Sequence, residues 1–281
     1  MMGVRIITDS TSDISIEEAG KMGLAIVPLK VIFGNTEYKE GIEISMEGFY
    51  EKLVTSEKLP TTSQPAPDDF LEQYLKAKEA GDSVVVVLIA GKLSGTFQSA
   101  IIAKEMAEYS QIYVVDSLTS IIGLRLLVEH AVNLVKQGLE AIQIAKTLEE
   151  LKERIVLFAM VDTLEYLHKG GRLSKSSAII GSLLNFKPII TLKDGAIQVV
   201  GKERGTNKGL ARILEAIDEF GAIDQNYSVN FGFTAEDSKS LLLKEKVIDK
   251  YALKNYGMYP VGCVVGVHVG PGACMIAYIK Q

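Results

Sequence analysis

Three short segments of this chain combine hydrogen-bond donors with backbone that glycine or proline bends. They are Pro-Thr-Thr-Ser-Gln-Pro at residues 60–65, Leu-Ser-Gly-Thr at 93–96 and Gly-Val-His-Val-Gly-Pro-Gly at 266–272. Hydroxyls and free backbone N–H groups bind anions, whereas bond cleavage needs a positioned acid or base. None of the segments contains an obvious acid–base pair, so together they favour a site that holds an anion over a hydrolytic site.

Ser94 stands where a strand-like run at 83–89 passes into a helix expected from 95 to 108. A helix N-terminus presents unpaired N–H groups and the positive end of the helix dipole. Ser94 is therefore either an N-cap or a ligand contact, with the Gly95 amide and Thr96 beside it. The spacing departs by one residue from the Gly-x-Ser-x-Gly pattern of a nucleophilic serine, which disfavours acyl-enzyme chemistry.

Thr62 and Ser63 lie in a stretch that the following prolines keep extended. Their hydroxyls either line a cleft or belong to a polar loop before a helix that starts near Asp68. His268 poses a similar choice. A lone histidine in an apolar strand, expected here at 261–267, is usually a core residue, but the Gly-Pro-Gly run at 270–272 gives close access to its backbone.

Asp9 and Asp116 each follow a predicted strand, at 4–8 and 112–115 respectively. Ligands of open parallel sheets bind beyond the carboxyl ends of the strands, so these acids could hold a metal or act as nucleophiles. Aspartate and its hydroxyl neighbours are also common in turns and caps. Threonine at position 11 departs from the Asp-x-Asp pattern of aspartyl-phosphate enzymes, and a structural role is the simpler interpretation.

Basic residues stand beside glycine at two places, Lys-Gly-Gly-Arg at 169–172 and Lys-Glu-Arg-Gly at 202–205. A guanidinium on flexible backbone suits a phosphate or a carboxylate. Arg172 and Arg204 are therefore candidates for contact with an anion or a partner, although most charge clusters are simply solvated.

The composition narrows the class of protein. The chain has 281 residues, 47% of them hydrophobic, and a net charge of −5, so a nucleic-acid partner is not expected. Two cysteines and three histidines make a disulfide framework or a zinc site improbable. The N-terminus has no signal-peptide pattern and no apolar stretch is long enough to span a bilayer, so we expect a cytoplasmic protein.

Strand and helix patterns alternate through the first half, which predicts a parallel sheet layered by helices. A second strand is expected at 24–33. The second half mixes helices, one of them at 176–184, with a hairpin whose turn is Lys-Asp-Gly at 193–195. We therefore predict an α/β protein of two domains: an N-terminal parallel sheet flanked by helices (1–162), and a mixed α+β domain (163–281). Clefts between domains are common ligand sites.

Six motifs occur in the order in which the DegV family has them. They are Thr-Asp-Ser-Thr-Ser-Asp at 8–13, Thr-Ser-Gln-Pro at 62–65, Lys-Leu-Ser-Gly-Thr at 92–96, Val-Val-Asp-Ser at 114–117, Tyr-Leu-His-Lys-Gly-Gly-Arg at 166–172 and His-Val-Gly-Pro-Gly at 268–272. Nearly the whole chain thus resembles this family. The resemblance implies a two-domain DegV-like fold with a long-chain fatty acid, such as palmitate or oleate, buried between the domains.

The resemblance also implies a function. Members are similar to the fatty-acid-binding subunit of bacterial fatty acid kinase, which presents the carboxylate to a separate ATP-dependent kinase that makes an acyl phosphate for phospholipid synthesis. Carried over by motif, Thr62, Ser94 and His268 hold the carboxylate, with Ser63, Gly95 and Thr96 as additional contacts. Arg172 and Arg204 match positions that contact the anion or the kinase.

On this interpretation the chain is a binding subunit without catalysis, metal or cofactor of its own. Its partners are the fatty acid, the kinase subunit and, transiently, a membrane surface. Two alternatives stay open: a metal-dependent hydrolase or phosphotransferase that uses Asp9 or Asp116, and an interaction protein whose cavity has lost its ligand.

Overall fold

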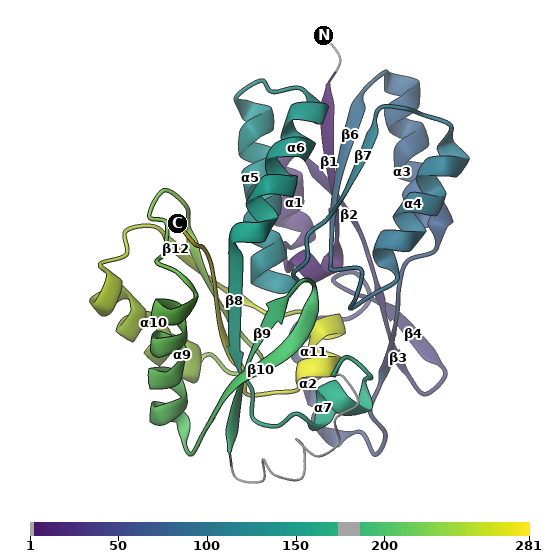
Figure 1. Ribbon diagram of the computed structural model, residues 1–281. Helices are drawn as coiled ribbons and strands as arrows, with labels where there is room; N and C mark the ends of the chain where they lie inside the picture. Colours follow the sequence, from purple (N-terminus) through teal and green to yellow (C-terminus); the bar gives the residue numbers. More distant parts are fainter. Residues whose placement is uncertain (1–2, 174–185) are drawn as a thin grey trace.

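The computed structural model describes residues 3–173 and 186–281 (Figure 1). It has a parallel sheet covered by helices and a second, mixed sheet, so the predicted α/β fold class is confirmed. The helix expected at 176–184 lies outside the described residues.

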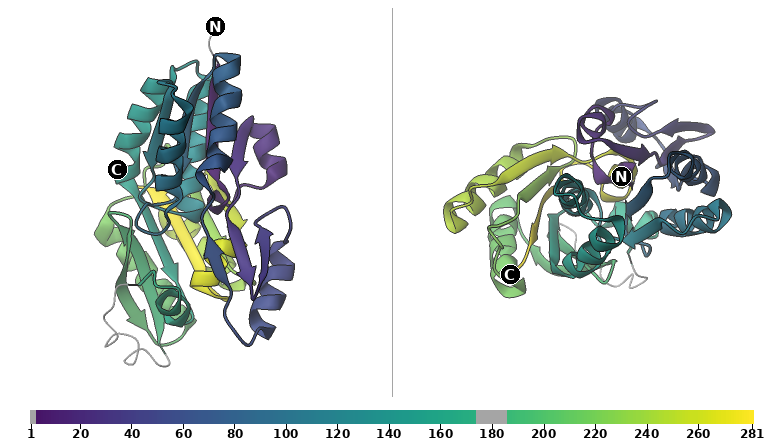
Figure 2. Two further views of the ribbon diagram at one scale, coloured as in Figure 1. Left: turned by 90° about the vertical axis from the view of Figure 1, so that its right-hand side faces the viewer. Right: turned by 90° about the horizontal axis from the view of Figure 1, so that it is seen from above.

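The parallel sheet has four strands in the order β2-β1-β6-β7. Its strands are β1 (Val4–Asp9), β2 (Leu24–Val27), β6 (Ser83–Leu88) and β7 (Ile112–Asp116). Every residue of β6 is buried, as expected of a valine run that helices cover on both faces. The covering helices are α3 (Pro67–Ala80) and α4 (Thr96–Ala107) on one face, and α1 (Ile16–Met22), α5 (Ile121–Lys136) and α6 (Ala141–Leu151) on the other (Figure 2).

The mixed sheet has six strands in the order β10-β9-β8-β13-β11-β12. Its strands are β8 (Ile155–Met160), β9 (Lys187–Lys193), β10 (Ala196–Glu203), β11 (Val229–Phe233), β12 (Tyr256–Pro260) and β13 (Cys274–Ile279). The predicted hairpin is confirmed: Asp194 and Gly195 join β9 to β10 with φ values of 50° and 75°. Helices α9 (Thr206–Phe220) and α10 (Ser238–Tyr251) cover one face of this sheet.

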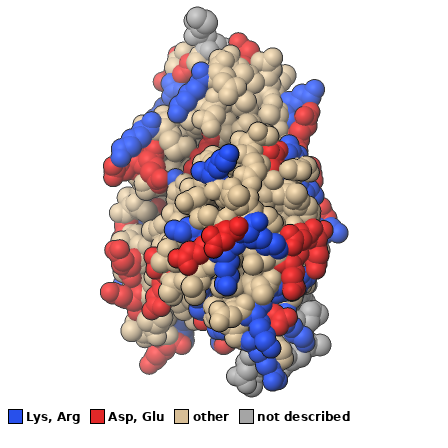
Figure 3. All heavy atoms as spheres, turned by 90° about the vertical axis from the view of Figure 1, so that its left-hand side faces the viewer, with Lys and Arg blue, Asp and Glu red and all other residues tan. Residues whose placement is uncertain are grey.

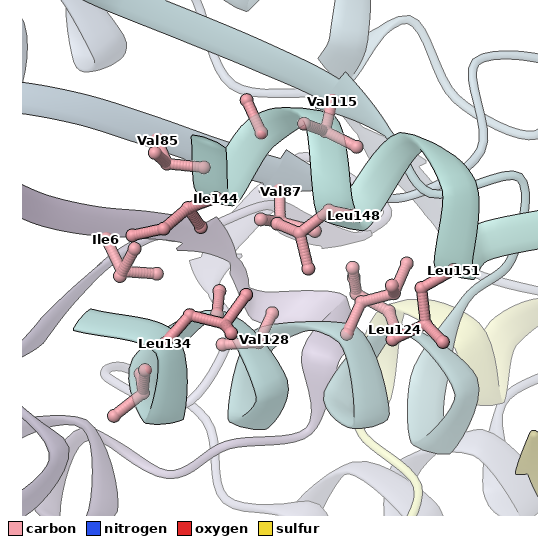
Figure 4. Close-up of a cluster of buried hydrophobic side chains, with 14 of the residues drawn as sticks. Ile6, Val85, Val87, Val115, Leu124, Val128, Leu134, Ile144, Leu148 and Leu151 are labelled. Carbon is pink, nitrogen blue, oxygen red and sulfur yellow. The ribbon is translucent and has the colours of Figure 1, made fainter. Parts of the chain in front are cut away.

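Helix α5 joins the two sheets because it is apolar on nearly every side. Leu124 and Val128 pack with α6 against the parallel sheet, in the cluster that Figure 4 shows. Ile122 and Leu126 pack against the mixed sheet. Within β8 the side chains alternate: Phe158 faces α9, whereas Leu157 and Ala159 face the α5 side.

The single strand expected at 24–33 is wrong, because the chain divides at Pro28 into β2 and β3 (Lys30–Phe33). Strand β3 leaves the parallel sheet and pairs with β4 (Thr36–Lys39) and β5 (Thr61–Ser63) in a third sheet, which the sequence did not predict. Helix α2 (Met46–Thr55) follows β4. The extended backbone expected around Thr62 is confirmed, since Thr62 pairs with Val31.

The strand expected at 261–267 is also wrong. The segment forms helix α11 (Cys263–Val269), which places His268 on a helix beside α7 (Glu165–Lys169). Valines at 264, 265 and 267 favour a strand, but contacts with distant parts of the chain override that local preference.

Strand pairing bears on the division of the chain. The expected boundary near residue 162 assigns β8 to the N-terminal domain, but β8 pairs with β9 and β13 in the mixed sheet. The division into domains 1–162 and 163–281 stays a prediction. Two short 3-10 helices, at Ser10–Ser12 and Lys152–Arg154, lie in the first part of the chain.

Acidic and basic side chains lie next to one another on the face that carries α9 and α10 (Figure 3). One ion pair, between Lys250 and Asp218, bridges these two helices at 2.6 Å. In the described ranges no helix combines the length and apolarity that crossing a membrane requires.

Candidate ligand cavity

A cavity of about 400 Å³ lies beyond the carboxyl ends of β6 and β7, where the parallel sheet meets the mixed sheet. The parallel-sheet part contributes residues that follow β6 and β7, together with β5. The other part contributes β8, β9, β13, α11 and the segment after α7. A cavity of this size accommodates a small organic ligand.

Thr62 and His268 meet in the cavity although 206 positions separate them. The Thr62 Oγ1 atom lies 3.0 Å from His268 Nε2, within hydrogen-bond distance. His268 Nδ1 is buried and has no partner among the described residues. It faces Gly170 so closely that a Cβ at that glycine would lie 2.2 Å from Nδ1. The imidazole is thus held between β5 and the end of α7.

The histidine is neutral at physiological pH. Burial, with a contribution from the positive charge of Arg172, lowers the pKa of His268 to about 4. A neutral imidazole has one donor and one acceptor nitrogen, so Nε2 can either donate to the Thr62 hydroxyl or accept from it.

Ser94 and Gly95 line the cavity at the start of α4. The Ser94 hydroxyl lies 2.8 Å from Thr96 Oγ1 and accepts a longer hydrogen bond, of 3.3 Å, from the Thr96 amide. The N-cap of α4 is Gly95, so the N-cap role considered for Ser94 is wrong. Its place in the cavity wall keeps Ser94 a candidate for ligand contact. Thr96 is buried and is not part of the wall.

Arg172 also lines the cavity. Its Nε donates to the Leu93 carbonyl at 3.1 Å, and its Nη1 donates to the Gly170 carbonyl at 2.7 Å. Burial lowers the pKa of Arg172. The guanidinium has no carboxylate partner within residues 3–173 and 186–281, and the intervening segment contains no aspartate or glutamate. Arg172 thus brings to the wall a positive charge that no carboxylate of the described residues neutralises.

The described cavity wall has a positively charged side chain and no acidic one. Arg172 and His268 are its only ionisable residues within the described ranges, and no acid joins them. A buried charge is costly unless it is paired. An anionic ligand would supply the missing partner.

The rest of the wall is largely apolar. Leu157, Ala159, Ile190, Ile197 and Met275 come from the mixed sheet, on the face turned away from α9. The cavity thus combines an apolar body with polar groups from β5, from the residues before α4, from the segment after α7 and from α11.

Three polar residues of the wall were missed as candidates. They are Gln64, Ser120 and Thr191. Gln64 packs on Gly95 so tightly that a Cβ at the glycine would lie 1.9 Å from Gln64 Oε1. The Thr191 hydroxyl is already satisfied by the Leu157 carbonyl at 2.8 Å. Ser63 was a candidate and does line the cavity.

Asp9 and Asp116 lie outside the wall and serve the backbone. Asp9 Oδ2 accepts from the Ile89 amide at 2.8 Å, and Asp9 Oδ1 accepts from the Thr11 amide at 2.9 Å. Asp116 Oδ1 accepts from the amides of Gly91 and Leu118. Both acids therefore hold the loops at strand ends, as the structural interpretation proposed. The described residues contain no cluster of three or more His, Cys, Asp or Glu arranged for a metal ion.

Arg204 lies apart from the cavity wall. It is exposed, and its guanidinium stacks over the Phe186 ring at 4.9 Å from the centroid. Both cysteines, Cys263 and Cys274, are buried free thiols, as expected.

Fold and cavity together define a class of α/β proteins in which a parallel and a mixed sheet enclose a mainly apolar cavity with a polar wall segment. The chain belongs to the DegV family: the family model matches residues 3–281. A DegV domain-containing protein of Caldanaerobacter subterraneus subsp. tengcongensis is 33% identical over 281 residues, which are 100% of both chains.

Solved structures agree with the assignment to the DegV family. One described as "Fatty Acid Binding of a DegV family Protein from Thermus thermophilus" is 32% identical, with a TM-score of 0.91 over 99% of this chain and 100% of that one. A stearic acid-binding protein of Eubacterium ventriosum ATCC 27560 is 30% identical, with a TM-score of 0.89 over 100% of this chain and 98% of that one.

Proposed function

We propose that this protein binds a long-chain fatty acid, with the carboxylate at Thr62, Ser94, His268 and Arg172 and the acyl chain in the apolar body of the cavity. One observation carries the proposal: the described wall holds a guanidinium without an acidic partner beside a largely apolar lining. The fatty acids bound by the Thermus and Eubacterium relatives support it.

The energetics fit a fatty acid. A sixteen-carbon acid has about fourteen methylenes, and at ~0.8 kcal/mol each their burial contributes on the order of 11 kcal/mol before the costs of association. A carboxylate buried without partners would cost several kcal/mol. Hydroxyls, an imidazole, a helix N-terminus and a guanidinium are the groups that offset this cost. The alternative, a hydrolase or phosphotransferase, relies on Asp9 or Asp116, and both acids lie outside the wall and accept hydrogen bonds from backbone amides.

Extraction of the purified protein into organic solvent, followed by mass spectrometry, tests the proposal. We expect close to one equivalent of long-chain acid, or stoichiometric uptake of added palmitate by protein stripped of lipid. Protein that carries no acid and takes up neither palmitate nor oleate would refute it.

The carboxylate contacts are tested by the pair Thr62→Ala and Ser94→Ala. Each removes a hydrogen bond to a charged group, worth roughly 1.5–3 kcal/mol, so each should weaken palmitate binding about tenfold or more. Thr36→Ala is the matched control, since Thr36 is an exposed threonine of the same three-stranded sheet and lies outside the wall. A double variant that binds as wild type does would exclude these hydroxyls as carboxylate contacts.

The finer part of the proposal is that the protein presents its fatty acid to a separate ATP-dependent kinase, which forms the acyl phosphate. Family resemblance supports this role, with Arg204 as an exposed residue for kinase docking. The test is to mix palmitate-loaded protein with a fatty acid kinase catalytic subunit and ATP, and to trap acyl phosphate with hydroxylamine. Acyl phosphate should require both proteins. Its formation at equal rates from free palmitate without this protein would contradict the presenting role.

A further inference from the structure

Helix α11 carries His268 into the cavity, but on its own a helix of this sequence would be unstable. It has seven residues, and its N-cap is Gly262, which offers no side-chain hydrogen bond. Isolated helices shorter than about 12 residues are marginal in water, and the first amides of any helix need partners from elsewhere.

Two carboxylates from the far end of the sequence supply those partners. Asp13 Oδ1 accepts from the Gly262 amide at 2.9 Å, and Glu40 Oε1 accepts from the Val264 amide at 2.7 Å. A Cβ at position 262 would lie 2.5 Å from Glu40 Oε1 and 3.0 Å from Asp13 Oδ1. Both acids therefore touch the same helix turn, and glycine is required where they approach it.

Glu40 is in turn held by the first part of the chain. Its Oε2 accepts from the Ser10 hydroxyl at 2.6 Å, and the Ser10 oxygen accepts from the Leu29 amide at 3.0 Å. The Glu40 amide donates to the Leu29 carbonyl at 3.0 Å. Leu29 lines the cavity. A buried hydrogen-bond network thus connects the cavity wall, the Asp-Ser-Thr-Ser-Asp segment at 9–13 and the start of α11.

The same helix is fixed along its length. Tyr50 Oη donates to the Val261 carbonyl at 3.2 Å, and Phe49 packs so closely on Gly266 that a Cβ there would lie 2.8 Å from its ring. His268 is four residues beyond Val264, about 6 Å along the helix axis. A shift of the first turn of α11 would therefore displace the imidazole as well. The contact between the imidazole and Thr62 tolerates little movement.

Burying the carboxyl groups of Asp13 and Glu40 costs free energy, and holding a helix does not by itself require carboxyl groups. Burial raises the pKa of Asp13 and of Glu40, and the proximity of Glu40 raises that of Asp13 further. Apolar residues of similar size often stabilise a core as well as buried charges do. What apolar residues lack is the direction that hydrogen bonds impose on the amides of one helix turn.

We propose that Asp13 and Glu40 are positioning residues for ligand binding: they cap α11 from the opposite part of the molecule and so set the place of the His268 imidazole. The inference rests on the proposed function, because it assigns His268 to the ligand carboxylate. It gives the segment 9–13 a role that is neither catalysis nor metal binding.

The experiment replaces Glu40 in two ways. Glu40→Leu removes both acceptor oxygens at similar volume, whereas Glu40→Gln keeps an acceptor for the Val264 amide. Glu47→Gln, at an exposed acid in the first turn of α2, is the control. The imidazole of His268 is observed by ¹⁵N NMR, which is practical since the chain has three histidines and His268→Gln assigns the signal. Palmitate affinity is measured by calorimetry on lipid-free protein.

We expect Glu40→Leu to shift the His268 nitrogen resonances and to weaken palmitate binding about tenfold, while Glu40→Gln stays close to wild type. In a His268→Ala background, Glu40→Leu should cause no further loss of affinity, because its effect acts through the imidazole. A purely structural role predicts the same loss in both backgrounds, and that result would overturn the proposal.

Unchanged His268 resonances in folded Glu40→Leu would overturn it as well. If circular dichroism shows that this variant does not fold, Asp13→Ala and Asp13→Asn make the same comparison at the Gly262 amide, with the same two refuting outcomes. Because the NMR signal is read without ligand, a protein that fails to bind palmitate at all would refute the proposed function while the resonances still decide the positioning role.

Discussion

Substitution of Gly170 by alanine tests the placement of His268 from the opposite side. Gly170 has φ of −74°, which alanine adopts without strain, so the effect of the substitution is steric. The added Cβ would lie 2.2 Å from His268 Nδ1, and ordinary van der Waals contact begins at 3.4 Å. The imidazole must therefore move by about 3.4 − 2.2 = 1.2 Å, unless α7 moves instead.

A displacement of that size breaks the contact with Thr62. Because the imidazole lies between Gly170 and Thr62, a shift away from Gly170 drives Nε2 toward Thr62 Oγ1, which is already 3.0 Å away, so the ring must turn and the hydrogen-bond geometry is lost. Loss of the hydrogen bond, together with a misplaced ligand contact, should weaken palmitate binding about tenfold. Overpacking should also lower the free energy of unfolding by about 1–3 kcal/mol.

Calorimetric titration of lipid-free protein with palmitate measures the first effect, and urea denaturation measures the second. Gly20→Ala is the control: Gly20 lies in α1 with no atom within 4 Å of an added Cβ, so alanine should leave affinity unchanged. In a His268→Ala background, Gly170→Ala should lose most of its effect on affinity, because its closest steric partner is gone. The reasoning is refuted if Gly170→Ala binds palmitate as tightly as wild type and keeps the His268 nitrogen resonances in place.

Three further predictions follow from charge and burial. Arg172→Gln should weaken palmitate binding about 10- to 100-fold but leave hexadecanol binding nearly unchanged, as measured by displacement of a fluorescent fatty acid; equal losses for both ligands would argue against a charge interaction. Because the pKa of His268 falls from 6.5 to about 4 on folding, the unfolded chain binds the extra proton between these values, so folding stability should fall as pH drops through that window, by up to about 3 kcal/mol. Urea denaturation should show this component in wild type and not in His268→Gln; identical pH profiles would contradict the pKa. Leu148 is fully buried in the cluster of Figure 4, so Leu148→Ala should lower the free energy of unfolding by about 2–5 kcal/mol. Calorimetry should find the palmitate affinity of this variant unchanged. A large loss of affinity in folded protein would contradict this prediction and show that the cluster and the cavity are coupled.

The sequence predicted correctly those elements that are determined by residues close to one another in the chain. The valine run of β6 indicated a strand covered on both faces, and the Asp-Gly pair at 194–195 indicated the hairpin. Ser15 and Glu18 form a capping box at the start of α1, a structure that their three-residue spacing favours. In each case the residues that determine the structure lie within a few positions of one another.

Elements that depend on distant residues were predicted wrongly or not at all. Helix α11 reads as a strand because its valines favour one, and the acids that cap it, Asp13 and Glu40, are 249 and 224 positions away. Strand β3 was merged with β2 since its partners, β4 and β5, are recognisable only once the third sheet has formed.

The candidate site shows the same division. Thr62, Ser94 and His268 were chosen for their residue types, glycine neighbours and family motifs, and the structure places all three in one cavity wall. Arg172 joins them, whereas Thr96 and Arg204 do not. Gln64 and Thr191 had no local signal that set them apart from other polar residues, because their place in the wall depends on the packing of α4 and on the position of β9 between β8 and β10.

The position of β13 has a consequence for biosynthesis. Of the strands of the mixed sheet, β13 is the last in the sequence, yet it lies between β8 and β11. Without β13, strands β10, β9 and β8 would not be paired with strands β11 and β12. A ribosome-bound chain that lacks residues 274–279 could complete the parallel sheet, but it would leave the mixed sheet split. Since α11, which carries His268 into the cavity wall, directly precedes β13, a nascent polypeptide can complete the cavity only after translation has passed nearly every other helix and strand.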